Sequence, residues 1–196
     1  MAIWYFGGAL AGYFFLHSLL AAEGVKSRLT RNFIPPRLYR LAYNVLAAGL
    51  ILPLAVLYSN VEKERIFEPM TLSTICGWLM LAAGAVIGYL AMRQYDLSEF
   101  SGTAQLRQNT GSPVTTLNTR GVNAVVRHPL YLASLLTVWG AFLVLPYDVV
   151  LLAAVVTSIY LVIGTLLEEQ KLRRAFGEEY EVYRQQVPML LPRLFD

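Results

Sequence analysis

The stretch "RHPLY" stands directly before a long apolar run and holds three side chains suited to chemistry, Arg127, His128 and Tyr131. His128 precedes Pro129, so its backbone is biased toward an extended conformation, and the proline suits the first turn of a helix. His128 therefore lies near a helix N-terminus, where unpaired N–H groups and the helix dipole attract anionic or electron-rich groups. This pattern indicates a binding or acid–base site. The alternative is that Arg127 and His128 anchor the chain at a membrane interface and Tyr131 belongs to an aromatic belt.

A carboxylate pair, Glu168 and Glu169, follows another apolar run. Adjacent residues on a helix point in different directions, so one carboxylate can face solvent while the other faces the protein interior. A carboxylate near the end of a membrane span marks a candidate site, and the alternative is a solvated helix end. The turn "LPYDV" joins the two apolar runs as a hairpin, which brings His128 and Glu168 to the same membrane face.

His17 lies inside the apolar sequence "YFFLHSLLAA". An ionisable side chain within a span is a functional candidate by default. The alternative is a neutral histidine hydrogen-bonded to Asn44 or to a tyrosine. Both interpretations stay open at this point.

Signatures of several other chemistries are missing from the sequence. It contains no GxGxxG after a strand, no Walker loop, no HExxH and no serine elbow. Two histidines and one cysteine, Cys76, are too few for an obvious metal centre or a disulfide framework. We therefore predict no metal site.

The composition indicates an integral membrane protein, because 56% of the residues are hydrophobic and only 15% are charged. Apolar runs of roughly 20 residues can cross a bilayer. Five such runs predict an all-α bundle of five transmembrane helices in a single domain, residues 1–196, with spans at 3–22, 38–59, 71–92, 130–146 and 147–167. The long segment between the third and fourth runs contains a candidate β-hairpin at 115–126.

Lysine and arginine are distributed unevenly between the predicted loops. They crowd the loop after the first span, the segment before residue 130 and the C-terminal tail, whereas the other two loops carry few. This distribution predicts an N-terminus outside and a C-terminus in the cytoplasm of a bacterial inner membrane. The net charge of +3 is explained by contact with membrane lipids and does not require a nucleic-acid partner.

The C-terminal tail, residues 168–196, is predicted to form an amphipathic helical cap on the cytoplasmic membrane surface. Its apolar side chains recur at three-to-four-residue spacing and so share one helix face: Leu172, Ala175, Phe176, Tyr180, Tyr183 and Val187. Gly177 is a candidate break, and Pro188 and Pro192 end the helix.

The motif RHPxY followed by "EEQKLRRAFGEEYEVYRQQVPMLLP" resembles the isoprenylcysteine carboxyl methyltransferase family and its wider relatives, the phospholipid methyltransferases and small bacterial thiol methyltransferases. The resemblance covers the C-terminal part of the chain. It implies an S-adenosylmethionine-dependent methyltransferase with a cytoplasmic cofactor site and a lipophilic or small acceptor bearing a carboxylate, thiol or amine.

Site residues carried over from this resemblance belong to two groups. The cofactor contacts would be His128, Pro129, Leu130, Tyr131, Glu168, Glu169, Tyr180, Tyr183, Val187 and Pro188, the last four forming a lid. Arg127 would orient an anionic acceptor, and His17 or a glutamate would serve as a base for a thiol or amine. The N-terminal "FFLHSLLAAEGVKSRL" and "YRLAYNVLA" are also similar to methanethiol methyltransferases, which implies that His17 and Tyr43 belong to the acceptor side.

Two other functions remain as alternatives to methyl transfer. A sterol-reductase-like membrane enzyme would have a related pocket but use NADPH. A non-enzymatic membrane binding protein would keep the fold without the reaction, so substituting Glu168, Glu169 or His128 would leave its role unchanged.

Overall fold

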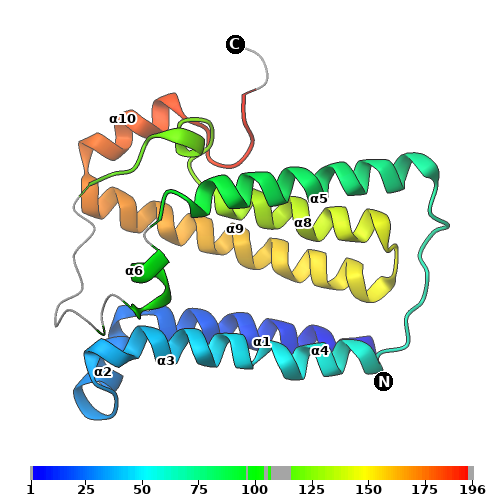
Figure 1. Ribbon diagram of the computed structural model, residues 1–196, viewed down its shortest axis with the longest axis horizontal. Helices are drawn as coiled ribbons and strands as arrows, with labels where there is room; N and C mark the ends of the chain where they lie inside the picture. The colour runs from blue at the N-terminus through cyan, green and yellow to red at the C-terminus, as the bar shows by residue number, and fades with distance from the viewer. Residues whose placement is uncertain (1, 96, 104–105, 107–115, 194–196) are drawn as a thin grey trace. The chain divides into compact units, whose positions relative to one another are not determined.

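The computed structural model describes residues 2–95, 97–103, 106 and 116–193. Within these ranges helix is the only regular secondary structure, in agreement with the all-α prediction, and one isolated β-bridge joins Arg65 to Tyr147. The helices, in the order shown in Figure 1, belong to two compact units: unit 1 is residues 1–63 and 95–113, and unit 2 is residues 64–94 and 114–196. Each unit is described by itself below, and the single domain stays a prediction.

Unit 1 consists of α1 (Ile3–Ala21), α2 (Glu23–Asn32), α3 (Pro36–Gly49), α4 (Ile51–Asn60) and the short α6 (Leu97–Ser101). Pro36 begins α3 at the position where a missing N–H costs least. The predicted second span, 38–59, corresponds to α3 and α4 together, interrupted at Leu50. Pro53 explains the interruption, because its ring clashes with the carbonyl four residues earlier, at Gly49, and it cannot donate to that group.

The short helix α6 packs on α3 through a close backbone approach. Gly102 has a φ of +89°, and a Cβ added there would lie 2.8 Å from the backbone nitrogen of Leu41. Asn44 fixes the same contact by donating its side-chain amide to the carbonyl of Ser101 over 3.0 Å. A glycine is therefore required where the chain passes α3.

Unit 2 consists of α5 (Thr71–Met92), the 3-10 turn η1 (Gly121–Ala124), α8 (Pro129–Val144), α9 (Asp148–Phe176) and α10 (Glu178–Gln186). The candidate β-hairpin at 115–126 is wrong for the described residues 116–126, which form no strand, and 121–124 form η1; residue 115 lies outside the described ranges. Gly121, with a φ of +59°, starts this turn against the side chain of Gln94. The turn leads directly into the RHPLY stretch.

Helices α5 and α8 approach each other closely because small residues face each other. A Cβ added at Gly84 would lie 2.8 Å from Thr137 Oγ1 and 2.9 Å from the carbonyl of Ala133. Gly77 and Gly140 meet in the same way further along the pair. Such small-residue contacts are a common way for apolar helices to pack in a membrane.

The hairpin predicted from "LPYDV" joins α8 to α9, and its turn is held by the segment before α5. Asp148 donates its backbone N–H to the carbonyl of Glu64 over 2.9 Å, and its carboxylate accepts from the backbone N–H of Glu64 and of Val149. Ile66 donates to the carbonyl of Pro146 over 2.8 Å. These bonds fix the far ends of α5, α8 and α9 relative to one another.

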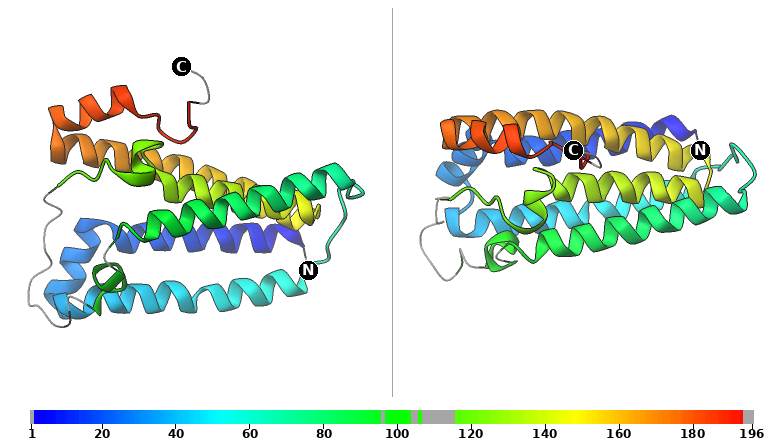
Figure 2. Two further views of the ribbon diagram at one scale, coloured as in Figure 1. Left: turned by 45° about the horizontal axis from the view of Figure 1, so that its top comes forward. Right: turned by 90° about the horizontal axis from the view of Figure 1, so that it is seen from above.

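The predicted fifth span, 147–167, and the first part of the predicted tail helix form one continuous helix, α9. It runs for nine residues beyond Leu167 to Phe176, because the sequence 168–176 is rich in good helix formers. Gly177, with a φ of +53°, ends it, and α10 then runs back along the end of α9 (Figures 1 and 2). The apolar face of the tail accordingly packs within unit 2: Tyr180, Tyr183 and Val187 are buried against Leu117, Leu172 and Phe176.

Among the described residues, four helical stretches are long and apolar enough to cross a membrane: α1, α3 with α4, α5 and α9. The predicted fourth span, 130–146, corresponds to α8, whose 16 residues are fewer than the roughly 20 that a straight crossing needs. Four of the five predicted spans therefore meet the length criterion. The crossing by α8 and the cytoplasmic cap stay predictions.

Candidate active site

The RHPLY stretch is positioned by the start of α8 and by the chain after α10. His128 occupies the N-cap position of α8 with a φ of −124°, and Pro129 is the first helical residue. The backbone N–H of Arg127 donates to the carbonyl of Pro188 over 2.9 Å, and that of His128 donates to Met189 over 3.1 Å. Two segments that are distant in the sequence are thus paired directly at the candidate site.

Glu169 is the centre of a buried ion cluster, which comprises Arg127, His128, Glu169, Tyr180 and Arg184. Its carboxylate accepts from Arg127 in a bidentate pair, with Nε–Oε1 of 2.9 Å and Nη2–Oε2 of 3.0 Å. His128 Nε2 lies 2.8 Å from Oε1, and the Tyr180 hydroxyl donates to the same oxygen over 2.6 Å. Charge-assisted bonds of this kind are shorter and stronger than neutral ones.

Arg127 is fully engaged within the protein. Besides its pair with Glu169, its Nη1 donates to the carbonyls of Arg184 and Val187, at the end of α10. Only 8% of its side chain is exposed. Because all three guanidinium nitrogens donate to protein groups, this arrangement gives Arg127 a role in holding α10 to α9.

Arg184 was missed by the sequence reasoning and contributes a second cation to the ion cluster. Its Nε lies 3.3 Å from Glu169 Oε2 in a charge contact that is not a hydrogen bond, and its Nη1 donates to Glu181 over 2.8 Å. Arg184 could have been found in the sequence from its spacing of four residues to Tyr180, which places both side chains on one face of α10.

Glu168 has a different environment from its neighbour. Its side chain is 45% exposed, whereas that of Glu169 is 10% exposed. His128 Nδ1 lies 3.6 Å from Glu168 Oε2, an ion-pair distance. The ring of Tyr131 stacks on that of His128, with centroids 5.5 Å apart. The imidazole therefore links a buried carboxylate to an accessible one.

The electrostatics of the ion cluster favour a protonated His128. Burial alone would lower its pKa, but the hydrogen bonds and charges of Glu168 and Glu169 outweigh burial and raise the pKa above the ordinary 6.5. Burial and the neighbouring Glu169 also raise the pKa of Tyr180, so its hydroxyl stays a donor. The raised pKa favours the imidazolium, which would donate to Glu169 and lie at ion-pair distance from Glu168, and it makes His128 a weaker candidate for a general base.

The remaining site residues of the tail hold α10 in place. The hydroxyl of Tyr183 donates to the carbonyl of Asn123, in η1, over 2.6 Å. Val187 packs beside Tyr183, and the carbonyls of Val187 and Pro188 accept from Arg127.

Two further predicted site residues, Pro129 and Leu130, lie at the start of α8. Pro129 is buried, and Leu130 is half-buried.

His17 lies in unit 1, on α1. The hydroxyl of Tyr43, on α3, lies 2.9 Å from its Nε2 and 3.0 Å from its Nδ1, so the predicted hydrogen bond to a tyrosine is present. The ring of Tyr13 lies 6.0 Å from that of His17.

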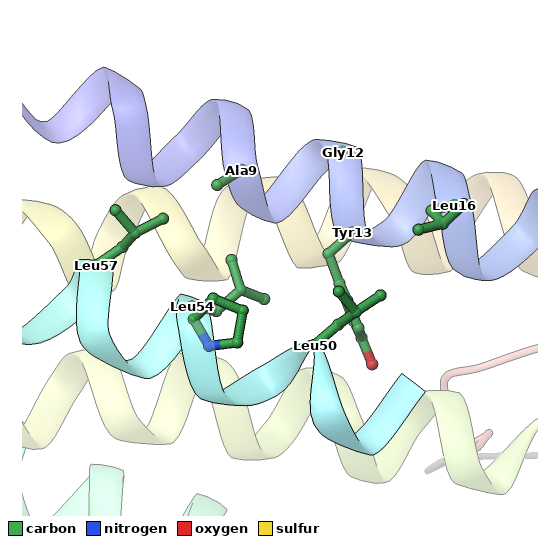
Figure 3. Close-up of a pocket in the computed structure, with 8 residues that line it drawn as sticks. Ala9, Gly12, Tyr13, Leu16, Leu50, Leu54 and Leu57 are labelled. Carbon is green, nitrogen blue, oxygen red and sulfur yellow. The ribbon is translucent and has the colours of Figure 1, made fainter. Parts of the chain in front are cut away.

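Tyr13 also lines a pocket of about 170 Å³ between α1 and α4, shown in Figure 3. The rest of its lining is apolar: Ala9, Gly12, Leu16, Leu50, Pro53, Leu54 and Leu57. An apolar cavity of about 150 Å³ is large enough for benzene. Unit 1 thus offers a space for a small apolar molecule, with an imidazole and two phenols close by.

No cluster of three or more metal-ligating side chains occurs within the described ranges. The ion cluster instead consists of a carboxylate saturated by donors. A metal at Glu169 would have to displace two arginines and a tyrosine.

A family model described as phospholipid methyltransferase matches residues 72–179, from the start of α5 to the start of α10. The chain belongs to the phospholipid methyltransferase family. The segment matched to this methyltransferase family includes Arg127, His128, Glu168 and Glu169. Most of the matched segment lies in unit 2.

Several relatives of the chain are named methanethiol S-methyltransferase. The chain is 31% identical over 192 residues to the methanethiol S-methyltransferase of Pseudomonas deceptionensis, covering 91% of this chain and 68% of that protein. It is 30% identical over 185 residues to methanethiol S-methyltransferase 2 of Bradyrhizobium diazoefficiens, covering 91% of this chain and 69% of that protein.

A third relative, methanethiol S-methyltransferase 1 of the same bacterium, is 27% identical over 183 residues. That alignment covers 90% of this chain but 62% of the relative, so the chain spans less than two thirds of its length. No solved structure matches the chain.

Proposed function

We propose that the protein is an integral membrane methyltransferase that transfers a methyl group from S-adenosylmethionine to a small thiol at the cytoplasmic membrane face. The family match and the names of the relatives support a membrane methyltransferase and favour it over a sterol-reductase-like enzyme or a non-enzymatic binder. The observation that carries the proposal is the pair formed by His128 and Glu168 where α8 begins, inside the matched segment.

The residues at the start of α8 fit the polar groups of S-adenosylmethionine. The helix N-terminus with the cationic His128 attracts a carboxylate such as that of the donor's amino acid. Glu168, nearly half exposed, can accept from an ammonium group or from ribose hydroxyls. When bound, the cofactor supplies an electrophilic methyl group on a sulfonium.

Glu169 and Arg127 are proposed to act as positioning residues. Glu169 is hydrogen-bonded to both His128 and Arg127, and Arg127 also bonds the end of α10. S-adenosylmethionine would therefore bind to a preorganised surface. Tyr180, Tyr183, Val187 and Pro188 are proposed as the lid that excludes water, since displacement at a sulfonium gains from desolvation and alignment.

A thiol is the acceptor favoured by the names of the relatives. The proton leaves the thiol, the resulting thiolate forms a bond to the methyl carbon, and the carbon–sulfonium bond breaks to leave two neutral thioethers. His17 is proposed to take the thiol proton, because its imidazole lies at hydrogen-bond distance from the Tyr43 hydroxyl and near Tyr13, which lines the apolar pocket of unit 1.

Calorimetric binding of S-adenosylmethionine to the detergent-solubilised chain tests the donor. Glu168→Gln is expected to weaken binding about tenfold, since one hydrogen bond to a charged group contributes roughly 1.5–3 kcal/mol. Glu179→Gln, at an exposed glutamate on α10, is the matched control and should leave binding unchanged. No binding by the folded parent protein would refute the proposal, as would a thermal shift with NADPH alone.

Transfer of labelled methyl to a panel of acceptors tests the acceptor. Methanethiol is expected to be labelled, and phosphatidylethanolamine, a prenylated thiol and a fatty acid are not. Gly12→Leu, which fills the apolar pocket, should raise the KM for the thiol without changing donor affinity. Gly8→Leu is the control, because both glycines have open space around them but only Gly12 lines the pocket. Labelling of the amine lipid alone would refute the thiol assignment.

A further inference from the structure

The connection between α1 and α3 carries a concentration of positive charge that the proposed reaction does not use. Residues 23–40 contain five basic residues and one acidic residue, a net charge of +4, whereas the whole chain has a net charge of +3. The rest of the chain is therefore net −1. The positive charge of this protein is a local feature of unit 1.

We call this connection, residues 23–40, the basic turn. Its four arginines are Arg28, Arg31, Arg37 and Arg40. All four are exposed, and none of their side chains makes a hydrogen bond or ion pair with another described residue. The fifth cation, Lys26, is paired with Glu23 over 3.2 Å. Arg28 and Arg31 are three residues apart on α2, and Arg37 and Arg40 are three apart on α3, so each pair shares a helix face.

Large apolar side chains accompany the basic turn. Phe33, between α2 and α3, is 77% exposed, and Leu38 is also exposed. The basic turn joins α1 directly to the α3–α4 stretch, and both are long and apolar enough to cross a membrane. Exposed aromatic and arginine side chains next to such helices lie at the depth of lipid headgroups.

We propose that the basic turn binds the phosphate groups of anionic phospholipids, with Phe33 inserted beside them. Arginine forms planar bidentate contacts with phosphate, which suits four guanidinium groups without side-chain partners among the described residues. Nucleic acid would explain the charge but not the exposed phenylalanine between two apolar spans. Positive charge also orients a chain during membrane insertion, so the test is made on protein already folded in detergent.

The experiment measures the thermal unfolding midpoint of the full chain in detergent micelles doped with phosphatidylglycerol or with phosphatidylcholine. A lipid that binds the folded state raises the midpoint by mass action. Phosphatidylglycerol is expected to raise the midpoint and phosphatidylcholine is not. Each arginine is worth roughly a fivefold change in lipid affinity, so Arg28→Gln with Arg31→Gln should weaken binding about 25-fold.

The charge-matched control is Lys63→Gln with Arg65→Gln, which removes two cations outside the basic turn and should leave the midpoint shift unchanged. Replacing all four arginines with lysine keeps the charge, should retain most of the shift, and serves where the glutamine variants do not fold. Equal shifts with the two lipids, or an unchanged shift in the Arg28/Arg31 variant, would overturn the proposal. Full competition by inorganic phosphate or by an oligonucleotide would also overturn it, in favour of a free anion or a nucleic acid. None of these measurements involves methyl donor or thiol, so failure of the proposed function would leave them unaffected.

Discussion

The arginines of the ion cluster in unit 2 and those of the basic turn in unit 1 differ in what surrounds them. In unit 2, Arg127 is buried and bonded at every guanidinium nitrogen, and Arg184 and Arg173 are paired with glutamates. In unit 1, the four arginines of the basic turn are exposed and without partners among the described residues. A buried charge is tolerated only when paired, whereas an exposed one can be left for an external anion. The same residue type therefore builds the ion cluster in unit 2 and forms the exposed basic turn in unit 1.

The largest effect is expected on removing the carboxylate at the centre of the ion cluster. Glu169→Ala leaves Arg127 and His128 buried without their anion, so the free energy of unfolding should fall by about 3–5 kcal/mol. Glu168→Ala, at the exposed neighbour, should change it by less than about 1 kcal/mol. Denaturant titration in detergent measures both. Equal losses in the two variants would show that Glu169 has no special role.

A smaller loss is expected from the hydroxyl of Tyr180. Tyr180→Phe removes a donor to a charged acceptor, which is worth about 1.5–3 kcal/mol. Tyr183→Phe removes a bond to the neutral carbonyl of Asn123 and should cost about 1 kcal/mol. The two tyrosines share one helix and one apolar cluster, so comparing them isolates the charge of Glu169. A larger loss at Tyr183 would contradict this difference.

The stability of unit 2 should also depend on pH through His128. Its folded-state pKa is raised, so its stabilising effect is complete below the unfolded pKa of about 6.5 and is lost as the pH rises through the folded pKa. The groups that face it are Glu168, Glu169, Arg127, Tyr131 and Tyr180.

The free energy of unfolding is measured from below pH 6.5 to above the folded pKa of His128, in a His17→Gln variant so that His128 is the only histidine left. It should fall as the pH rises. Adding His128→Gln should flatten the profile. The pH-dependent change in the free energy of unfolding should be smaller than the loss expected for Glu169→Ala, because Arg127 stays paired with Glu169 at every pH of this titration. A profile that keeps its slope in the double variant would assign the titration to another group.

The smallest effect is expected in the basic turn. Arg28→Gln with Arg31→Gln should alter the free energy of unfolding by no more than about 0.5 kcal/mol in lipid-free detergent, because exposed side chains without partners contribute little. Arg127→Gln, which makes the same chemical change in the ion cluster, should cost about 3 kcal/mol or more. Comparable losses would mean that the basic turn has structural partners and would remove the contrast between the units.

Much of the helical architecture could be predicted from the sequence because long apolar runs leave helix as the way to satisfy the backbone in a membrane. The hairpin at "LPYDV" was sufficient to place His128 beside Glu168. The extent of α9 and the fold-back at Gly177 were only partly predicted, because hydropathy ends at Leu167 while helix propensity continues to Phe176. The amphipathic pattern of the tail did not show where its apolar face packs, and Tyr180 on that face is completely buried within unit 2.

The sequence alone determined which residue types are available, a glutamate pair, a histidine before a proline and an aromatic tail, and it determined the helices that carry them. Only the tertiary structure decided which of these residues are buried and which stay accessible. Glu169 faces inward because α10 returns over it with Tyr180 and Arg184, while Glu168, one residue and about 100° around the same helix, stays accessible. A helix repeats every 3.6 residues, so the sequence shows that two neighbours diverge, but which one becomes buried depends on where distant segments pack.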